Sequence, residues 1–411
     1  MVTFLPSRPG RLADVPSFDR AIGGAESNVA CTLAAAGHSV RWVSRVGADG
    51  FGDHLVEAIG AYGVDVTAVR RDPARPTGIY FRTAGDRSTA AHEVAYYRTG
   101  SAASAMTVAT TDLDAVRAGR VLHLSGITAA LSKGCLGLMR ELTAPRAGRP
   151  LISFDVNYRP ALWPDADGAG VLLELARGAD VVFVGEDEAE EAWGVTGGPE
   201  AVRAVLPEPG VLVVKQGGVG ATAFVSAAGA RGLVAPTRRS RTCHSPAPLK
   251  PTGGQAVPPA DCHPAQPAGS RAARAAPDPR KGGTPHARAS DTAPASAPTP
   301  GIFVPALAVD VVATVGAGDA FAAGFLSATL RNLPLRDRLR HGHLTAAAAL
   351  TAQGDLAPPP TRHHADRLAA LDDDAWGKLR LGPGWTQADD HAVERAVDRA
   401  VDRADEEVRT P

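Results

Sequence analysis

One short stretch of the sequence combines the residues of an anion site with a proton acceptor. The string TVGAGD, residues 314–319, follows an apolar run and leads into small residues typical of a helix. The first amides of a helix have no intrahelical partner, so Gly316, Ala317 and Gly318 are expected to cradle an anion. Asp319 could accept a proton from a hydroxyl while these amides stabilise a transferring phosphoryl group. The alternative is that Asp319 is an ordinary first-turn carboxylate.

Several apolar runs must position this stretch. The runs RWVSRV, VLHLSGI, PLISFDVNY, ADVVFVG and GVLVVKQG lie between residues 41 and 217, and amphipathic segments separate them. Near-continuous Val, Ile and Leu runs are typical of strands buried on both faces of a parallel sheet, with helices between them. We therefore expect a doubly wound α/β domain.

A different pattern occupies residues 77–100. Polar and apolar residues alternate there on both sides of a central polar stretch, which predicts strand, turn and strand. We interpret this segment as a small β-lid over a site.

Two further segments differ in composition from the rest. Residues 236–300 contain 14 of the 33 prolines and almost no bulky apolar residues, so we expect a disordered insertion between two sheet strands. Its two Cys-His pairs have a spacing that fits no standard zinc site. Residues 376–411 are expected to form a charged tail, in which AVDRAVDRAD is typical of a solvated helix.

The bulk composition indicates an ordinary enzyme-like chain. With 411 residues, 44% of them hydrophobic, the chain is long enough for one large α/β core. The formal net charge of -1 gives no general attraction to nucleic acid or to anionic membranes. We find no spanning run and no signal peptide pattern, so we expect a cytoplasmic protein. The four cysteines are too few and scattered for a disulfide framework and are expected to be free thiols.

Beyond these patterns, the chain resembles the ribokinase-like (PfkB) carbohydrate kinases. The resemblance rests on TVGAGDAFAAGF, on GGAESNVA at residues 23–30 and on RVGADGFG at residues 45–52, and it extends over most of the chain outside the insertion and tail. It implies a three-layer α/β/α kinase domain formed by residues 1–235 and 301–375, with the lid in 77–100. It also implies ATP and Mg²⁺ as cofactors, and the lid strands of such kinases often pair between subunits, which allows a homo-oligomer.

The resemblance also implies roles for particular residues. Asp319 would be the general base and 316–318 the anion hole, with Thr314 beside the nucleotide. Glu188, in VGEDE, matches the glutamate that organises magnesium, although Gly185 replaces the family's asparagine. The segment VKQGGVGA resembles the nucleotide-side element, and its residues Lys215, Gly217 and Gly220 would approach ATP. A plain glycine turn is an alternative for that segment.

Within the family, the sequence is most similar to the 2-keto-3-deoxygluconate kinases, which hold the substrate carboxylate with a tyrosine and two arginines. Tyr96 and Arg98 are two residues apart on an expected strand and so share a face. Arg159 follows a core strand, and a guanidinium fork suits a planar carboxylate. The other residues implied around the sugar are Gly24, Asn28, Ile127 and Asp355. For any single arginine the alternative is a surface ion pair.

The sequence departs from the family pattern in two places. Ala313 stands where the family has an aspartate that helps to bind a monovalent cation. The family pattern also begins with a central strand that ends in Gly-Glu or Gly-Asp. That strand precedes the part of the pattern that this sequence matches from Met1 onward. We therefore expect an exposed sheet edge and weaker folding.

Three other functions remain open at this point. A kinase of a neutral sugar such as fructose or ribose, or of a nucleoside, would leave Arg98 and Arg159 without a carboxylate partner. A catalytically silent sugar-acid-binding protein would fit the departures and the long insertion. A dinucleotide-binding oxidoreductase is disfavoured because GAGD lacks the full GxGxxG spacing.

Overall fold

The computed structural model describes residues 1–8, 10–83, 93–163, 167–226 and 300–387. The chain divides into a compact unit of Met1–Ala235 with Pro298–Pro411 and a second unit, Pro236–Ala297. The expected insertion therefore lies outside the described residues, as do Cys243 and Cys262. Cys31 and Cys135 are buried free thiols. No helix in the described part of the chain is both long and apolar enough to cross a membrane.

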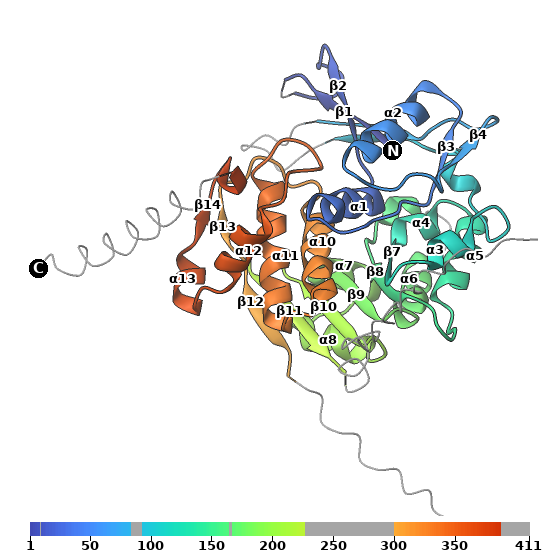
Figure 1. Ribbon diagram of the computed structural model, residues 1–411. Coiled ribbons are helices and arrows are strands. Elements are labelled where there is room, and N and C mark those ends of the chain that lie inside the picture. Colours follow the sequence, from blue (N-terminus) through green and yellow to red (C-terminus); the bar gives the residue numbers. More distant parts are fainter. Residues whose placement is uncertain (9, 84–92, 164–166, 227–299, 388–411) are drawn as a thin grey trace, which may run out of the picture. The chain divides into compact units, whose positions relative to one another are not determined.

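A six-stranded sheet forms the centre of the first unit (Figure 1). Its order is β12-β11-β10-β9-β8-β7, in which β7 to β10 are mutually parallel and β11 runs antiparallel to both neighbours. The strands are β7 (Val121–Ser125), β8 (Leu151–Asp155), β9 (Val181–Gly185), β10 (Val211–Lys215), β11 (Gly220–Val225) and β12 (Ile302–Pro305).

Helices cover both faces of this sheet, because its strands are apolar on both sides. In β9, Val181 and Phe183 pack in one core cluster, whereas Val182 and Val184 pack in the other. The first face carries α1 (Ala25–Ala35), α10 (Ala317–Leu330), α11 (Leu335–Leu350), α12 (Arg362–Ala369) and α13 (Asp373–Lys378). The second carries α5 (Lys133–Thr143), α6 (Gly168–Arg177), α7 (Glu186–Trp193) and α8 (Gly198–Val205). The expected three-layer α/β/α architecture is confirmed.

A smaller four-stranded sheet forms the lid, in the order β2-β1-β5-β6. Its strands are β1 (Val2–Pro6), β2 (Phe18–Ile22), β5 (Ile79–Arg82) and β6 (Val94–Tyr97). The antiparallel pair of β5 and β6 agrees with the expected strand, turn and strand, whose turn lies outside the described residues. The participation of the first 22 residues in this sheet was not expected.

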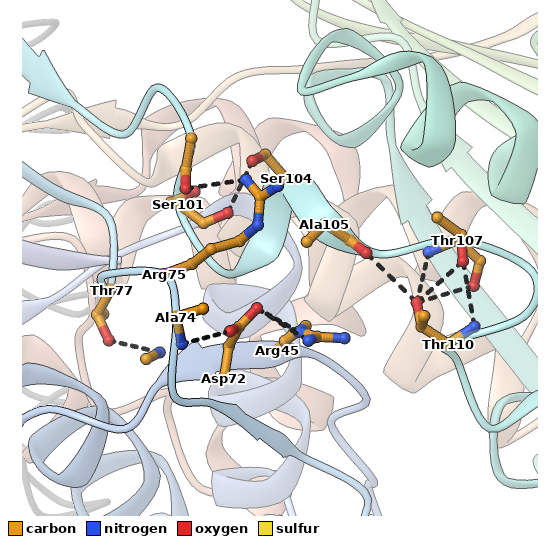
Figure 2. Close-up of polar contacts among 12 residues, drawn as sticks. Arg45, Asp72, Ala74, Arg75, Thr77, Ser101, Ser104, Ala105, Thr107 and Thr110 are labelled. Carbon is orange, nitrogen blue, oxygen red and sulfur yellow. Dashed lines mark hydrogen bonds and ion pairs between the residues drawn. The ribbon is translucent and has the colours of Figure 1, made fainter.

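The remaining elements connect these layers. They are β3 (Arg45–Gly47), α2 (Gly50–Ala61), β4 (Arg70–Asp72), η1 (Ala103–Ala105), α3 (Leu113–Arg117), α4 (Gly126–Ala130), η2 (Pro160–Leu162), β13 (Ala308–Val309), β14 (Arg380–Leu381) and η3 (Trp385–Gln387). Figure 2 shows polar contacts around the β3–β4 pair, where Asp72 accepts hydrogen bonds from Arg45 and from the Ala74 amide.

Two sequence expectations need correction. The run RWVSRV is not a central strand: its last two residues begin β3, which pairs with β4 outside the large sheet. Among the described residues the large sheet ends at β7, and a cavity borders that edge. The folded unit also extends beyond residue 375, because Trp376 and Trp385 are buried and β14 pairs with β13. Indole burial outweighs the charged composition of this part of the tail.

The core between the sheet and α10 yields a stability prediction. Phe183 is fully buried and makes edge-to-face contacts with Phe321 and Phe325, at centroid distances of 6.4 and 5.3 Å. We expect Phe183→Ala to lower the free energy of unfolding by about 3–5 kcal/mol because it leaves a cavity in this layer.

Chemical denaturation, followed by circular dichroism, measures this loss. The matched control is Phe303→Ala, which removes a half-exposed ring and should cost less than about 1 kcal/mol. Equal losses for the two variants would contradict the assigned core.

Candidate active site

A cavity of about 1320 Å³ extends along α1 and the β7 edge of the large sheet, and part of it lies where the lid strands, the N-terminus of α10 and the carboxyl ends of the parallel strands meet. Parallel α/β sheets bind ligands at the carboxyl ends of their strands. Most of the residues expected from the sequence border it. They are Gly24, Asn28, Tyr96, Arg98, Ile127, Arg159, Glu188, Lys215, Thr314, Gly316, Gly318, Asp319 and Asp355.

Three expected residues do not border the cavity. Ala317 is the first residue of α10, where only its amide could serve the site. Gly217 lies in the turn after β10, and Gly220 is the first residue of β11, where a side chain would collide with the carbonyl of Val304. Strand packing is thus a sufficient reason for glycine at position 220, and the approach of both glycines to ATP stays a prediction.

The N-terminus of α10 has the geometry of an anion cradle. Gly316 caps the helix with a left-handed φ of 83°, and α10 begins at Ala317. The amides of Ala317, Gly318 and Asp319 therefore occupy the first turn, where no intrahelical acceptor exists. A side chain at Gly316 would collide with the carbonyl of Asp355, so this turn needs glycine for its conformation and for its close packing.

Asp319 is the carboxylate of this turn, and its environment suits a base. Burial, helped by the nearby charge of Asp155, raises the pKa of Asp319 to about 7. A hydrogen bond of 2.8 Å from Asn28 Nδ2 to Asp319 Oδ2 opposes the rise, as does Lys215. A carboxylate with this pKa changes protonation near neutral pH, which suits general base catalysis.

Lys215 connects the cradle with a carboxylate that sequence reasoning did not select. Its Nζ lies 3.1 and 3.2 Å from the two oxygens of Asp155, the last residue of β8. Burial lowers the pKa of Lys215, but Asp155 and Glu188 outweigh that effect, so the net shift is upward and the ammonium stays charged. A Cβ on Gly318 would lie 3.7 Å from Nζ, which puts the ammonium beside the cradle. In the sequence, the position of Asp155 at the carboxyl end of an expected strand could have identified it as a site residue.

Glu188 and Arg159, to which the resemblance gave separate roles, contact each other. Arg159 Nη1 lies 3.1 Å from Glu188 Oε1, and the second oxygen of Glu188 accepts the Gly185 amide at 2.8 Å. Glu188 therefore also caps the start of α7. Arg159 is 53% exposed, so the ion pair is open to solvent on the arginine side.

The lid provides a second arginine, Arg98, which differs from Arg159 in its burial and in its contacts. Arg98 follows β6, and its guanidinium stacks over the Tyr96 ring at 5.0 Å from the centroid. Burial lowers the pKa of Arg98, and no carboxylate in the described parts of the chain forms an ion pair with it. Tyr96 and Arg98 share one face, as the spacing predicted. A half-buried cation that contacts an aromatic ring, and has the charge of Glu26 nearby but no ion pair, is suited to an anionic ligand.

Two further lid residues were missed, and both contact Asp355. Tyr80 donates a short hydrogen bond to Asp355 Oδ2, and Arg82 Nη2 lies 2.9 Å from Asp355 Oδ1. Their spacing of two on an alternating strand was the only signal in the sequence. Asp355 does border the cavity; its Oδ2 accepts the hydrogen bond of Tyr80, whereas its Oδ1 forms the ion pair with Arg82 but accepts no hydrogen bond from the described residues.

Comparisons with known proteins show which family the chain resembles. Two relatives are named 2-dehydro-3-deoxygluconokinase. The protein from Thermoproteus tenax is 36% identical over 220 residues, which cover 53% of this chain and 66%, just under two thirds, of that protein. The protein from Bacillus subtilis (strain 168) is 29% identical over 381 residues, which cover 90% of this chain and 92% of its own.

A solved structure and a family profile complete the comparison. The PfkB protein from Polaromonas sp. JS666 superimposes with a TM-score of 0.63 at 28% identity, over 90% of this chain and 97% of that one. The profile described as pfkB family carbohydrate kinase matches residues 2–240 and 292–362. Because this match spans more than half of the chain, the protein belongs to the pfkB family of carbohydrate kinases.

Proposed function

We propose that the protein transfers the γ-phosphoryl group of ATP to the terminal hydroxyl of an acidic sugar, 2-keto-3-deoxygluconate (2-dehydro-3-deoxygluconate in the relatives' names). The observation that carries this proposal is the carboxylate of Asp319, with its pKa near 7, beside the unpartnered amides of α10. The two relatives named for this reaction support the choice of acceptor.

The chemistry follows from the arrangement of these groups. The ionised Asp319 removes the proton from the acceptor hydroxyl. As the proton leaves, the oxygen of that hydroxyl forms a bond to the γ-phosphorus. The bond from the γ-phosphorus to the bridging oxygen breaks, and ADP leaves with that electron pair. The amides of the first turn of α10 and the ammonium of Lys215 stabilise the charge that develops on the phosphoryl oxygens.

Magnesium would be held jointly by the protein and the nucleotide. No group of three His, Cys, Asp or Glu residues in the described part of the chain could hold a metal ion by itself. Mg²⁺ in such sites usually keeps several waters and takes one or two carboxylates along with substrate phosphates. Glu188 fits this role, with Asp155 nearby. When bound, the ion would neutralise phosphate charge.

Recognition of an acid is supported most by Arg98. Its half-buried guanidinium has no carboxylate partner among the described residues and faces the same cavity as Asp319. A neutral sugar bound here would bury the Arg98 guanidinium further without giving it an anionic partner, and the loss of solvation would cost binding free energy. The pairing of Arg159 with Glu188 favours the second candidate, a neutral-sugar kinase, because half of the expected carboxylate clamp is already engaged.

The proposed base gives a direct test. We expect Asp319→Asn to lower kcat for 2-keto-3-deoxygluconate by about 10²- to 10⁴-fold, because the amide cannot accept the hydroxyl proton. ADP release with ATP, magnesium and the sugar acid measures the loss. The matched control is Asp53→Asn, an exposed first-turn carboxylate of α2, which should leave kcat unchanged. An Asp319→Asn enzyme that retains most of its activity would exclude this base.

The pH dependence tests the same carboxylate. Because Asp319 must be ionised to act, kcat should fall as the pH decreases below about 7. Asn28→Leu removes a hydrogen bond that favours the charged form, so the pKa rises and the acid limb should move upward by roughly one pH unit. Profiles from pH 5.5 to 9 measure the shift. Ser27→Ala, on the same helical turn, is the control, and an unmoved limb in Asn28→Leu would contradict the assignment.

Substrate class is tested at Arg98. We expect Arg98→Met to raise KM for the sugar acid by about 10- to 100-fold, the contribution of a hydrogen-bonded charge. Fructose and ribose serve as neutral acceptors, and Arg71→Met, which removes an exposed arginine outside the cavity, serves as the control variant. Preferred turnover of a neutral sugar, insensitive to Arg98, would instead establish the second candidate.

A further inference from the structure

One buried carboxylate joins the lid to the anion cradle. Asp355 lies in the loop after α11, and its side chain is bound by Tyr80 and Arg82 of β5. The Arg82 and Asp355 side chains are only 7% and 3% exposed. A buried ion pair of this kind depends on both partners, because removing one leaves an uncompensated charge in a poorly solvated place. The position of β5 and that of the Asp355 side chain are therefore tied together.

The backbone of Asp355 makes the second half of the link. Its carbonyl packs directly against Gly316, so closely that no side chain could be accommodated there. Gly316 caps α10 in the left-handed conformation, and the cradle amides and Asp319 follow it immediately. A displacement of the 355 loop therefore cannot occur without moving the turn that presents the cradle, because packed interiors transmit strain.

On the lid side, the contacts of Asp355 continue through β5 to Arg98, where the acceptor is proposed to bind. Strand β5 pairs antiparallel with β6, and Tyr80 is the register partner of Tyr96. The rings of Tyr80 and Tyr96 also contact each other, at a centroid distance of 5.5 Å. Tyr96 in turn stacks with Arg98, the proposed ligand of the substrate carboxylate. A ligand that orders Arg98 and Tyr96 is thus connected to Asp355 through a continuous set of contacts.

We propose that Arg82 is a positioning residue that couples acceptor binding at the lid to the anion cradle through Asp355. This inference rests on the proposed function, since it assumes that acceptor and nucleotide bind on the two sides of Asp355. Arg82 touches neither ligand in this account. Its role is to hold the loop so that sugar acid bound at Arg98 favours the cradle conformation that binds the nucleotide phosphates.

Such coupling is measured as a change in affinity. If the sugar acid tightens nucleotide binding by some factor, the nucleotide must tighten sugar-acid binding by the same factor. Calorimetric titration of a non-hydrolysable ATP analogue with Mg²⁺, with and without saturating 2-keto-3-deoxygluconate, gives this factor directly. For the unaltered protein we expect at least about fivefold tightening.

We expect Arg82→Met to reduce the factor by which the sugar acid tightens nucleotide binding to less than about two. Arg82→Lys, which keeps the charge, should retain most of this tightening. The matched control is Arg45→Met, because Arg45 and Asp72 form another ion pair at 2.9 Å with a buried carboxylate, in the β3–β4 region (Figure 2). Both Met variants should lose stability, but only Arg82→Met should lose the coupling. A merely structural role for Arg82 would not separate them.

The possible outcomes are distinct. An Arg82→Met protein that keeps the full factor, or an unaltered protein that binds both ligands without tightening, would overturn the coupling alone. An unaltered protein that binds the nucleotide but no sugar acid would overturn the proposed acceptor and the coupling with it. If Arg82→Met does not fold by circular dichroism, Arg82→Gln, which keeps hydrogen-bonding capacity without the charge, takes its place under the same criteria.

Discussion

The N-terminus of α10 imposes the central constraint on this protein. It must present free amides to an anion and, within the same turn, hold the carboxylate of Asp319. The two demands conflict, because a carboxylate and a bound phosphate would both be attracted to the positive end of the helix. Burial dominates the result, since the pKa of Asp319 rises to about 7 although Asn28 and Lys215 lower it. In the proposed reaction the carboxylate would thereby serve as a proton acceptor and not as a permanent occupant of the cradle.

The surrounding charges follow from that constraint. Three of the acids in the cavity form ion pairs with residues from distant parts of the chain: Asp155 with Lys215, Asp355 with Arg82, and Glu188 with Arg159. These pairs connect strand ends, the lid and the 355 loop, so they fix the geometry of the site as well as its charge. Arg98 differs from these residues, because no carboxylate of the described residues pairs with it. Glu26 also lines the cavity, and its charge partly opposes the burial that lowers the pKa of Arg98, so Arg98 has a negative charge nearby but no ion pair.

The sequence predicted correctly those elements that depend mainly on local patterns of residues. Four apolar runs became β7 to β10, and the GAGD turn became the N-terminus of α10, because strand burial and helix capping are largely local properties. The run RWVSRV failed because pairing decides whether an apolar run joins the large sheet, and its end pairs with β4 instead. Tyr80 and Arg82 were missed for a related reason. Their partner Asp355 is more than 270 residues away, and only the tertiary fold brings them together.

The two arginines expected to hold a carboxylate are physically unequal, and this bears on specificity. Arg159 is more than half exposed and already shares a carboxylate, so water and Glu188 stabilise its charge whether or not a ligand is present. Replacing those partners with a substrate carboxylate gains little. Arg98 is half-buried, its pKa is lowered by burial, and an aromatic ring covers one face of its guanidinium. A carboxylate would relieve an existing desolvation cost there, whereas a hydroxyl would relieve little of it. Discrimination between acidic and neutral sugars should therefore depend on the lid arginine.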